Sequence, residues 1–295
     1  MIKYLKYLYI FKIKNKFLSF FWKTISFLYF RKEGKPVNEL IVKNRKYLEI
    51  QGELIKKEEY LKNDYGILEK NFKYINEPIF NRLCNFDLIV FLINSIQKER
   101  INYLEIGASV LKTFMIVENN LKNSKLIAFD INPIISKHKD KFRHQDSKNN
   151  NLSFSGELKN QLYYFKGDLL DQKDTKDFKK LITDNFDFIF SDALHTKDGV
   201  ETEYYSIIKN KLNNKFFIYY DDLDTKWDSF GVQRGVFNIF YDLKKEKTNV
   251  NLYTFWIHGW IGQHENLHKN GIITNIDLDD LFKKYKLNLP FLKKY

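Results

Sequence analysis

The sequence predicts an α/β fold, in which a doubly wound and mostly parallel sheet follows a helical extension and ends with an antiparallel C-terminal strand. Three observations predict it. Five short apolar runs recur between residues 101 and 220, helix-length segments separate most of them, and acidic residues follow several of them. Strands that alternate with helices are typical of βαβ units and parallel sheets. Acidic residues after such strands indicate the sheet edge where open α/β folds bind ligands.

Composition and charge narrow the class of protein. The chain has 295 residues, of which 44% are hydrophobic and 17% aromatic, so it can bury a large core and is not globally disordered. Of the net charge of +12, residues 1–35 carry +8, which leaves +4 for the rest and argues against a nucleic-acid partner for the whole domain. Because Cys84 is the single cysteine, we expect a reducing, cytoplasmic location.

Residues 1–35 form a basic aromatic segment, with eleven aromatic residues among the first 30. Lysines interrupt every apolar run, so neither a spanning helix of about 18–20 residues nor a signal peptide is expected. One interpretation is a segment at an anionic membrane surface, which would place the protein at the inner face of a membrane. The other is a helix packed against the rest of the chain or against a partner.

The remaining chain divides into a helical extension at 36–75, an α/β domain at 76–280 and a tail at 281–295. Apolar spacing predicts a helix between Asn81 and Lys98. The polar residues 137–160 indicate a loop with a short helix. The predicted strands are Ile101–Ile106, Lys125–Phe129, Leu162–Phe165, Phe186–Ser191, Phe216–Tyr220 and an antiparallel pair, Asn251–His258 and Gly271–Ile276. Between that pair, the stretch around Trp260 is interpreted as a hairpin loop, with an acceptor pocket as the alternative.

The first strand runs into an acidic residue and a glycine, Glu105-Ile106-Gly107, followed by Ala108 and Ser109. A glycine at this point lets the backbone approach a ligand closely. A dinucleotide fingerprint would have three spaced glycines to seat a pyrophosphate, so a nicotinamide-dependent oxidoreductase is disfavoured. S-adenosylmethionine (SAM) has no phosphate and suits the looser pattern better.

The next two strands also end near carboxylates. Asp130 follows Gly107 by 23 residues, at the tip of the second strand, where it can accept hydrogen bonds from ribose hydroxyls. Asp168 follows the third strand and can contact an adenine amino group, or it can be a helix cap or turn residue.

The fourth and fifth strands are followed by Asp192, His195 and the pair Asp221-Asp222. Three carboxylates at one edge repel one another unless a cation lies between them, and hard oxygen ligands favour Mg²⁺. The sequence therefore predicts a metal site at Asp192, Asp221 and Asp222, and a neutral His195 as the general base. The alternatives are a structural histidine and an acidic pair that caps the next helix.

These motifs resemble class I SAM-dependent methyltransferases, which have a Rossmann-like domain. More narrowly, they are similar to the metal-dependent sugar O-methyltransferases of the macrocin and mycinamicin type and to the cephalosporin-hydroxylase-like group. The resemblance covers residues 100–245 best. The sequence departs from the family pattern at two places. Lys112 and Thr113 stand in the region where a glycine often closes the first motif, and Asp221 stands where glutamate is common.

The resemblance implies a SAM-dependent methyltransferase that methylates a hydroxyl of a sugar or other small acceptor, assisted by Mg²⁺ at Asp192, Asp221 and Asp222, with His195 as the base. Two alternatives stay open: a metal-independent methyltransferase acting on another nucleophile, and an idle module that binds a partner or membrane through residues 1–35. The residues expected to bind SAM are Glu105, Gly107, Ala108, Ser109, Asp130, Asp168 and Asp192.

Overall fold

A computed structural model describes residues 20, 21, 23–25, 27, 28, 33–63, 65–67, 69–77, 79, 81–142, 144–146, 151–155, 160–223, 231–262 and 267–295. Most of the basic aromatic segment, residues 1–35, lies outside this set, so its role stays a prediction. Within the described part of the chain, every helix is too short or too polar to cross a membrane.

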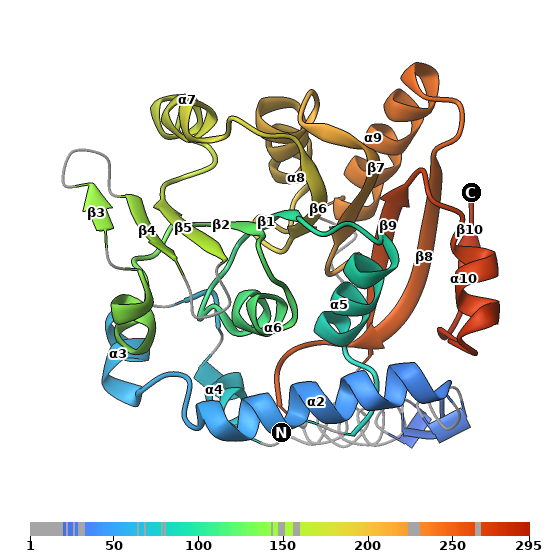
Figure 1. The fold of residues 1–295 in the computed structure, drawn as a ribbon, viewed down its shortest axis with the longest axis horizontal. Helices are drawn as coiled ribbons and strands as arrows, with labels where there is room; N and C mark the ends of the chain where they lie inside the picture. The colour runs from blue at the N-terminus through green and yellow to red at the C-terminus, as the bar shows by residue number, and fades with distance from the viewer. Residues whose placement is uncertain are drawn as a thin grey trace, which may run out of the picture.

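The described strands form one sheet in the order β10-β8-β9-β7-β6-β1-β2-β5-β4-β3. Its centre, β7-β6-β1-β2-β5, is parallel, and both edges are antiparallel. This confirms the predicted Rossmann-like doubly wound sheet with its antiparallel C-terminal strand (Figure 1). The strands are β1 Asn102–Ile106, β2 Lys125–Asp130, β3 His144–Asp146, β4 Asn151–Ser155, β5 Gln161–Lys166, β6 Phe186–Ser191, β7 Leu212–Tyr220, β8 Asn251–His258, β9 Leu267–Thr274 and β10 Lys293–Lys294.

The polar stretch 137–160 differs from its prediction. The expected short helix is present as the 3₁₀ helix η2, Ser136–Lys141, but the rest is not only loop. The strands β3 and β4 extend the sheet, and β4 pairs with β5 along its whole length, from Asn151 opposite Phe165 to Ser155 opposite Gln161. Backbone hydrogen bonds pair β4 with β5, and only two of its five residues, Leu152 and Phe154, are apolar, so the polarity of the stretch did not reveal a strand.

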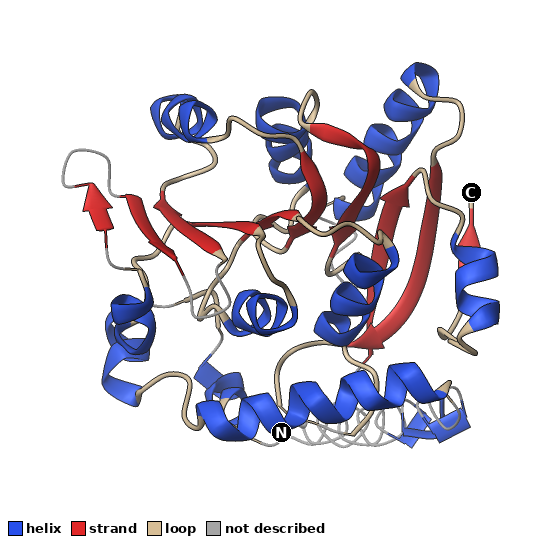
Figure 2. Ribbon diagram, viewed as in Figure 1, coloured by secondary structure: helices blue, strands red, loops and turns tan. Residues whose placement is uncertain are grey.

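Helices cover both faces of the sheet, as Figures 1 and 2 show. Residues alternate between the two faces of a strand, so Tyr103 of β1 packs with α5 and α6, whereas its neighbour Leu104 packs with α7, α8 and α9. The helices are α2 Lys35–Gln51, α3 Lys57–Asn63, η1 Glu69–Asn71, α4 Phe72–Ile75, α5 Asn85–Ser95, α6 Lys112–Asn120, α7 Gln172–Leu181, α8 Lys197–Glu203, the π-helix η3 Tyr204–Ile208, α9 Val232–Glu246 and α10 Leu278–Lys284.

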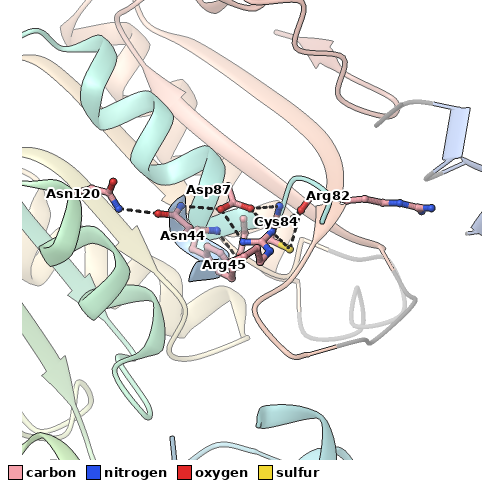
Figure 3. Close-up of polar contacts among 8 residues, drawn as sticks. Asn44, Arg45, Arg82, Cys84, Asp87 and Asn120 are labelled. Carbon is pink, nitrogen blue, oxygen red and sulfur yellow. Dashed lines mark hydrogen bonds and ion pairs between the residues drawn. The ribbon is translucent and has the colours of Figure 1, made fainter. Parts of the chain in front are cut away.

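A buried ion pair fixes the helical extension to the sheet domain (Figure 3). Asp87 of α5 is fully buried and accepts hydrogen bonds from the Arg45 guanidinium on both oxygens, at 3.1 and 2.7 Å. The same carboxylate also accepts from Asn44 Nδ2 at 2.9 Å and caps α5 through the backbone N–H of Cys84 at 2.9 Å. Every oxygen of the buried carboxylate is thus satisfied, and α2 is held across the start of α5.

Candidate functional site

The turn after β1 is shaped by Gly107, whose φ of +85° lies in the left-handed region. A Cβ at this position would lie 2.5 Å from the carbonyl carbon of Asp192 and nearer still to its oxygen, so only glycine fits. The N–H of Gly107 donates to the carbonyl of Phe129 at 2.9 Å, and the N–H of Asp192 donates to the carbonyl of Ile106 at 2.8 Å. The loops after β1 and β6 are therefore in direct backbone contact.

A pocket lies beside this turn, with about 210 Å³ of space that includes open solvent. Five of the residues predicted to bind SAM line it, and Asp130 and Asp168 do not. The lining residues are Glu105, Gly107, Ala108, Ser109, Val110, Lys112, Thr113, Asp192 and Trp260.

Trp260 shows that the stretch between β8 and β9 contributes to a pocket, beside the glycine turn. The segment from Leu54 to Ile75 covers the same region, because its apolar side chains pack with Val110 and Trp260. Ser109 is tied to this cover as well, since its hydroxyl donates to the carbonyl of Tyr65 at 2.7 Å. Residues 36–75 carry no motif, so this cover was not predicted.

Glu105 is a buried acid that lines the pocket. Burial raises its pKa well above the usual range, and the nearby charges of Asp192 and Asp130 act in the same direction. The hydroxyl of Tyr103 opposes this rise, because it donates to Glu105 Oε2 at 2.6 Å. The environment favours a neutral carboxyl, and a cationic ligand would favour its ionisation.

Asp130 ends β2, as predicted, and is held by the backbone around it. Its two oxygens accept from the N–H of Ser109 at 2.6 Å and from the N–H of Asn132 at 2.7 Å. Burial raises the pKa of Asp130 to about 6, against the effect of these hydrogen bonds. Because each carboxylate oxygen has a second lone pair, this geometry is compatible with a ribose contact.

Asp168 has the geometry of a turn residue. Its side chain accepts from the N–H of Leu170 at 2.9 Å, and its own N–H donates to Asp174 at 2.9 Å. The structure thus favours the turn interpretation over an adenine contact.

A chain of alternating carboxylates and imidazoles lies at the tips of β6, β7 and β9. His195 Nε2 is 3.2 Å from Asp192 Oδ1, and its Nδ1 is 3.8 Å from Asp222 Oδ2. The other oxygen of Asp222 is 2.9 Å from Nδ1 of His268. The structure brings together the predicted Asp192, His195 and Asp222, and it adds His268, which no sequence motif marks.

The ionisation of His195 differs from the predicted neutral form. Burial disfavours its charged ring, but the hydrogen bond to Asp192 and the charges of the neighbouring carboxylates outweigh that effect. They raise the pKa of His195 to about 9, which favours the imidazolium form at pH 7.

Asp221 is buried and has partners other than the imidazoles of His195 and His268. Its oxygens accept from the side-chain amides of Asn270, on β9, and of Asn85 at 3.2 Å, on α5. Burial, together with the charges of Asp192 and Asp222, raises the pKa of Asp221 to about 7. Nothing in the sequence linked these two asparagines to the acidic pair.

These contacts decide whether the three predicted carboxylates can hold a metal ion. In the described ranges, no group of three or more His, Cys, Asp and Glu side chains is arranged to hold one. The carboxylates of Asp192 and Asp222 face imidazoles, and that of Asp221 faces amides. A Mg²⁺ site at Asp192, Asp221 and Asp222 therefore stays a prediction that this side-chain arrangement does not support.

Comparisons with known proteins give structural neighbours alone. No family model matches the sequence, and no curated protein matches it. An O-methyltransferase from Bacillus cereus in complex with SAH is 18% identical, with a TM-score of 0.43 over 63% of this chain and 78% of that one. A putative O-methyltransferase from Klebsiella pneumoniae is 13% identical, with a TM-score of 0.42 over 82% and 90%. Spermidine synthase from Thermotoga maritima is 13% identical, with a TM-score of 0.39 over 71% and 65%. An activity does not follow from likeness at this level.

Proposed function

We propose that this protein is a SAM-dependent methyltransferase that methylates a hydroxyl group on a sugar or a similar small acceptor. The observation that carries the proposal is the position of Asp192. Its side chain lines the pocket beside the glycine turn, and the same carboxylate is hydrogen-bonded to His195. Asp192 therefore contacts both the pocket that would hold the cofactor and the histidine that would accept the proton.

The pocket residues suit the cofactor chemically. SAM carries a sulfonium cation, and Glu105 and Asp192 place two carboxyl groups in the pocket wall. Asp130, at the tip of the next strand, is positioned for the ribose hydroxyls. SAM, when bound, supplies an activated methyl group, and the chain supplies the orientation that brings it in line with the acceptor oxygen.

A hydroxyl nucleophile must lose its proton in the transition state. Because the pKa of His195 is about 9, its ring must first release a proton to solvent. The neutral ring, held between Asp192 and Asp222, then accepts the proton of the acceptor hydroxyl. Activity should therefore rise with pH between 7 and 9. A flat profile over that range would contradict this role.

Dependence on a metal ion can be tested separately. No step above requires an ion, and the imidazole partners of Asp192 and Asp222 favour transfer without one. Methyl transfer would be measured in EDTA and after addition of Mg²⁺. Loss of activity in EDTA that Mg²⁺ restores would establish the predicted ion, whereas full activity in EDTA would establish the metal-independent form.

The first experiment is a calorimetric titration of the purified protein with SAM, followed by transfer of labelled methyl groups to a panel of glycosides. The variant His195→Asn should retain SAM binding and lose about 10²- to 10⁴-fold in turnover. Asp198→Asn, at a side chain that is 93% exposed on the adjoining helix, is the matched control and should retain turnover. Absence of SAM binding would reject the proposal in favour of a partner-binding module.

A further inference from the structure

The described residues of the basic aromatic segment carry exposed apolar side chains on one side of a helix. Residues 20, 21, 23–25, 27 and 28 are helical, and Ile25 is buried in the core, which fixes the orientation of the helix. Phe20 and Leu28 are 69% and 66% exposed, and Phe21 and Phe27 are 40% and 49% exposed. Residues seven or eight apart lie on the same side of a helix, so these four side chains share one face, called here the aromatic face. Single exposed apolar residues are common on protein surfaces, but a contiguous set of this kind indicates a binding surface.

The charge that accompanies the aromatic face has one sign. Residues 1–35 contain eight Lys, one Arg and a single acidic residue, Glu33. Glu33 is only 9% exposed, and burial raises its pKa to about 7, so it adds little negative charge to the surface. Lys23, on the helix itself, is exposed. The apolar side chains are thus combined with positive charge that no exposed acid of the segment offsets.

The end of α10 adds further lysines beside the segment. The N–H of Gly34 donates to the carbonyl of Tyr285 at 3.0 Å, so the chain that connects the helix to α2 contacts the C-terminal end of α10. Lys283, Lys284 and Lys286, which surround Tyr285 in the sequence, are all exposed. Figure 1 shows the dark blue N-terminal helix and α10 at the same end of α2. Two distant stretches of sequence therefore place positive charge at one end of the molecule.

This combination of side chains fits one kind of partner better than the others. Protein interfaces are enriched in arginine and depleted in lysine, whereas residues 1–35 contain eight Lys and one Arg. A second copy of this chain would bring two segments of charge +8 together, and they would repel each other. A helix at a membrane surface inserts an apolar face, often with Phe and Leu, and keeps lysines at the anionic headgroups.

We propose that the aromatic face docks on the surface of an anionic lipid bilayer. The side chains of Phe20, Phe21, Phe27 and Leu28 enter the boundary between headgroups and acyl chains, while Lys23 and the lysines at the end of α10 contact the headgroups. The surface is separate from the pocket beside the glycine turn, so this inference does not depend on the proposed function.

Cosedimentation of the purified full-length protein with vesicles tests the proposal. The vesicles are of phosphatidylcholine, with and without phosphatidylglycerol, and the proteins are the wild type, Phe20→Ser/Leu28→Ser and the control Leu170→Ser/Tyr241→Ser. Leu170 and Tyr241 are 62% and 53% exposed, and they adjoin α7 and α9 on the other face of the sheet. Because all four side chains are exposed, urea unfolding should give nearly the same midpoint for the three proteins.

The wild type and the control should bind the vesicles that contain phosphatidylglycerol far better than those without it, and added salt should weaken binding because it screens the charges. Phe20→Ser/Leu28→Ser should bind at least about tenfold more weakly, since it removes apolar surface that enters the bilayer. Lys23→Ala should lose about fivefold at low salt. Lys180→Ala, at a side chain that is 77% exposed on α7, is the control for charge and should bind like the wild type.

Equal binding to both kinds of vesicle, or equal losses in Phe20→Ser/Leu28→Ser and its control, would overturn the proposal. Absence of vesicle binding by the wild type would overturn it as well. If size-exclusion chromatography then showed a concentration-dependent dimer that Phe20→Ser/Leu28→Ser abolishes, the aromatic face would be assigned to a second copy of the chain instead.

Discussion

Alanine at position 107 should destabilise the protein by about 2–5 kcal/mol. The left-handed φ of +85° costs a residue with a Cβ about 1–2 kcal/mol. The added carbon would also lie 2.5 Å from the Asp192 carbonyl carbon and 2.7 Å from the Ala193 Cα, so the loops after β1 and β6 would have to separate. Overpacking of this kind costs roughly 1–3 kcal/mol more.

Gly66 provides the control, because its φ is +73° but no atom lies within 4 Å of the position of its Cβ. Gly66→Ala should cost only the conformational part, about 1–2 kcal/mol. Urea unfolding of both variants would give the two losses of free energy, and SAM titration would show whether only Gly107→Ala weakens binding. Equal losses would refute the reasoning, since they would mean that the loops relax without cost.

Three further predictions concern the rest of the molecule. Asp87→Ala should cost about 3–5 kcal/mol in urea unfolding, because it leaves the Arg45 guanidinium buried without its partner, and a loss under 1 kcal/mol would contradict this. Burial and nearby lysines lower the pKa of His138 from 6.5 to about 3, so only the unfolded chain binds a proton between these values. Stability should therefore fall by about 1.4 kcal/mol for each pH unit below 6.5, and His138→Phe should remove that part of the slope. Burial raises the pKa of the Cys84 thiol to about 12, so a thiol reagent should label it only at the rate of unfolding.

The sequence predicted the centre of the sheet well because its parallel strands are buried on both faces. The strand predicted at Phe186–Ser191 is mostly apolar, and its ends coincide with those of β6 in the structure. The acidic residues after them could be grouped in advance for the same reason, since the carboxyl ends of parallel strands share one edge. Asp192, His195 and Asp222 meet there as expected.

The parts that the sequence did not reveal depend on long-range pairing. His268 reaches Asp222 only because β9 pairs antiparallel with β7 in one register, and no local pattern specifies that register. The Nζ of Lys112 donates to the backbone carbonyls of Ile75 and Trp260. Every residue has such a carbonyl, so the sequence does not mark these partners. The raised pKa of His195 was not predictable either, because it depends on the spacing of charges rather than on residue type.

The pocket wall around Lys112 determines when, during synthesis of the chain, the pocket can form. Its ammonium group joins the carbonyl of Ile75 to that of Trp260, so the first and the last parts of this wall are separated by most of the chain. A ribosome must synthesise about 260 residues before both carbonyls exist. The site therefore cannot form on a nascent chain that still lacks β8, and ligand capture would report completion of the fold rather than its beginning.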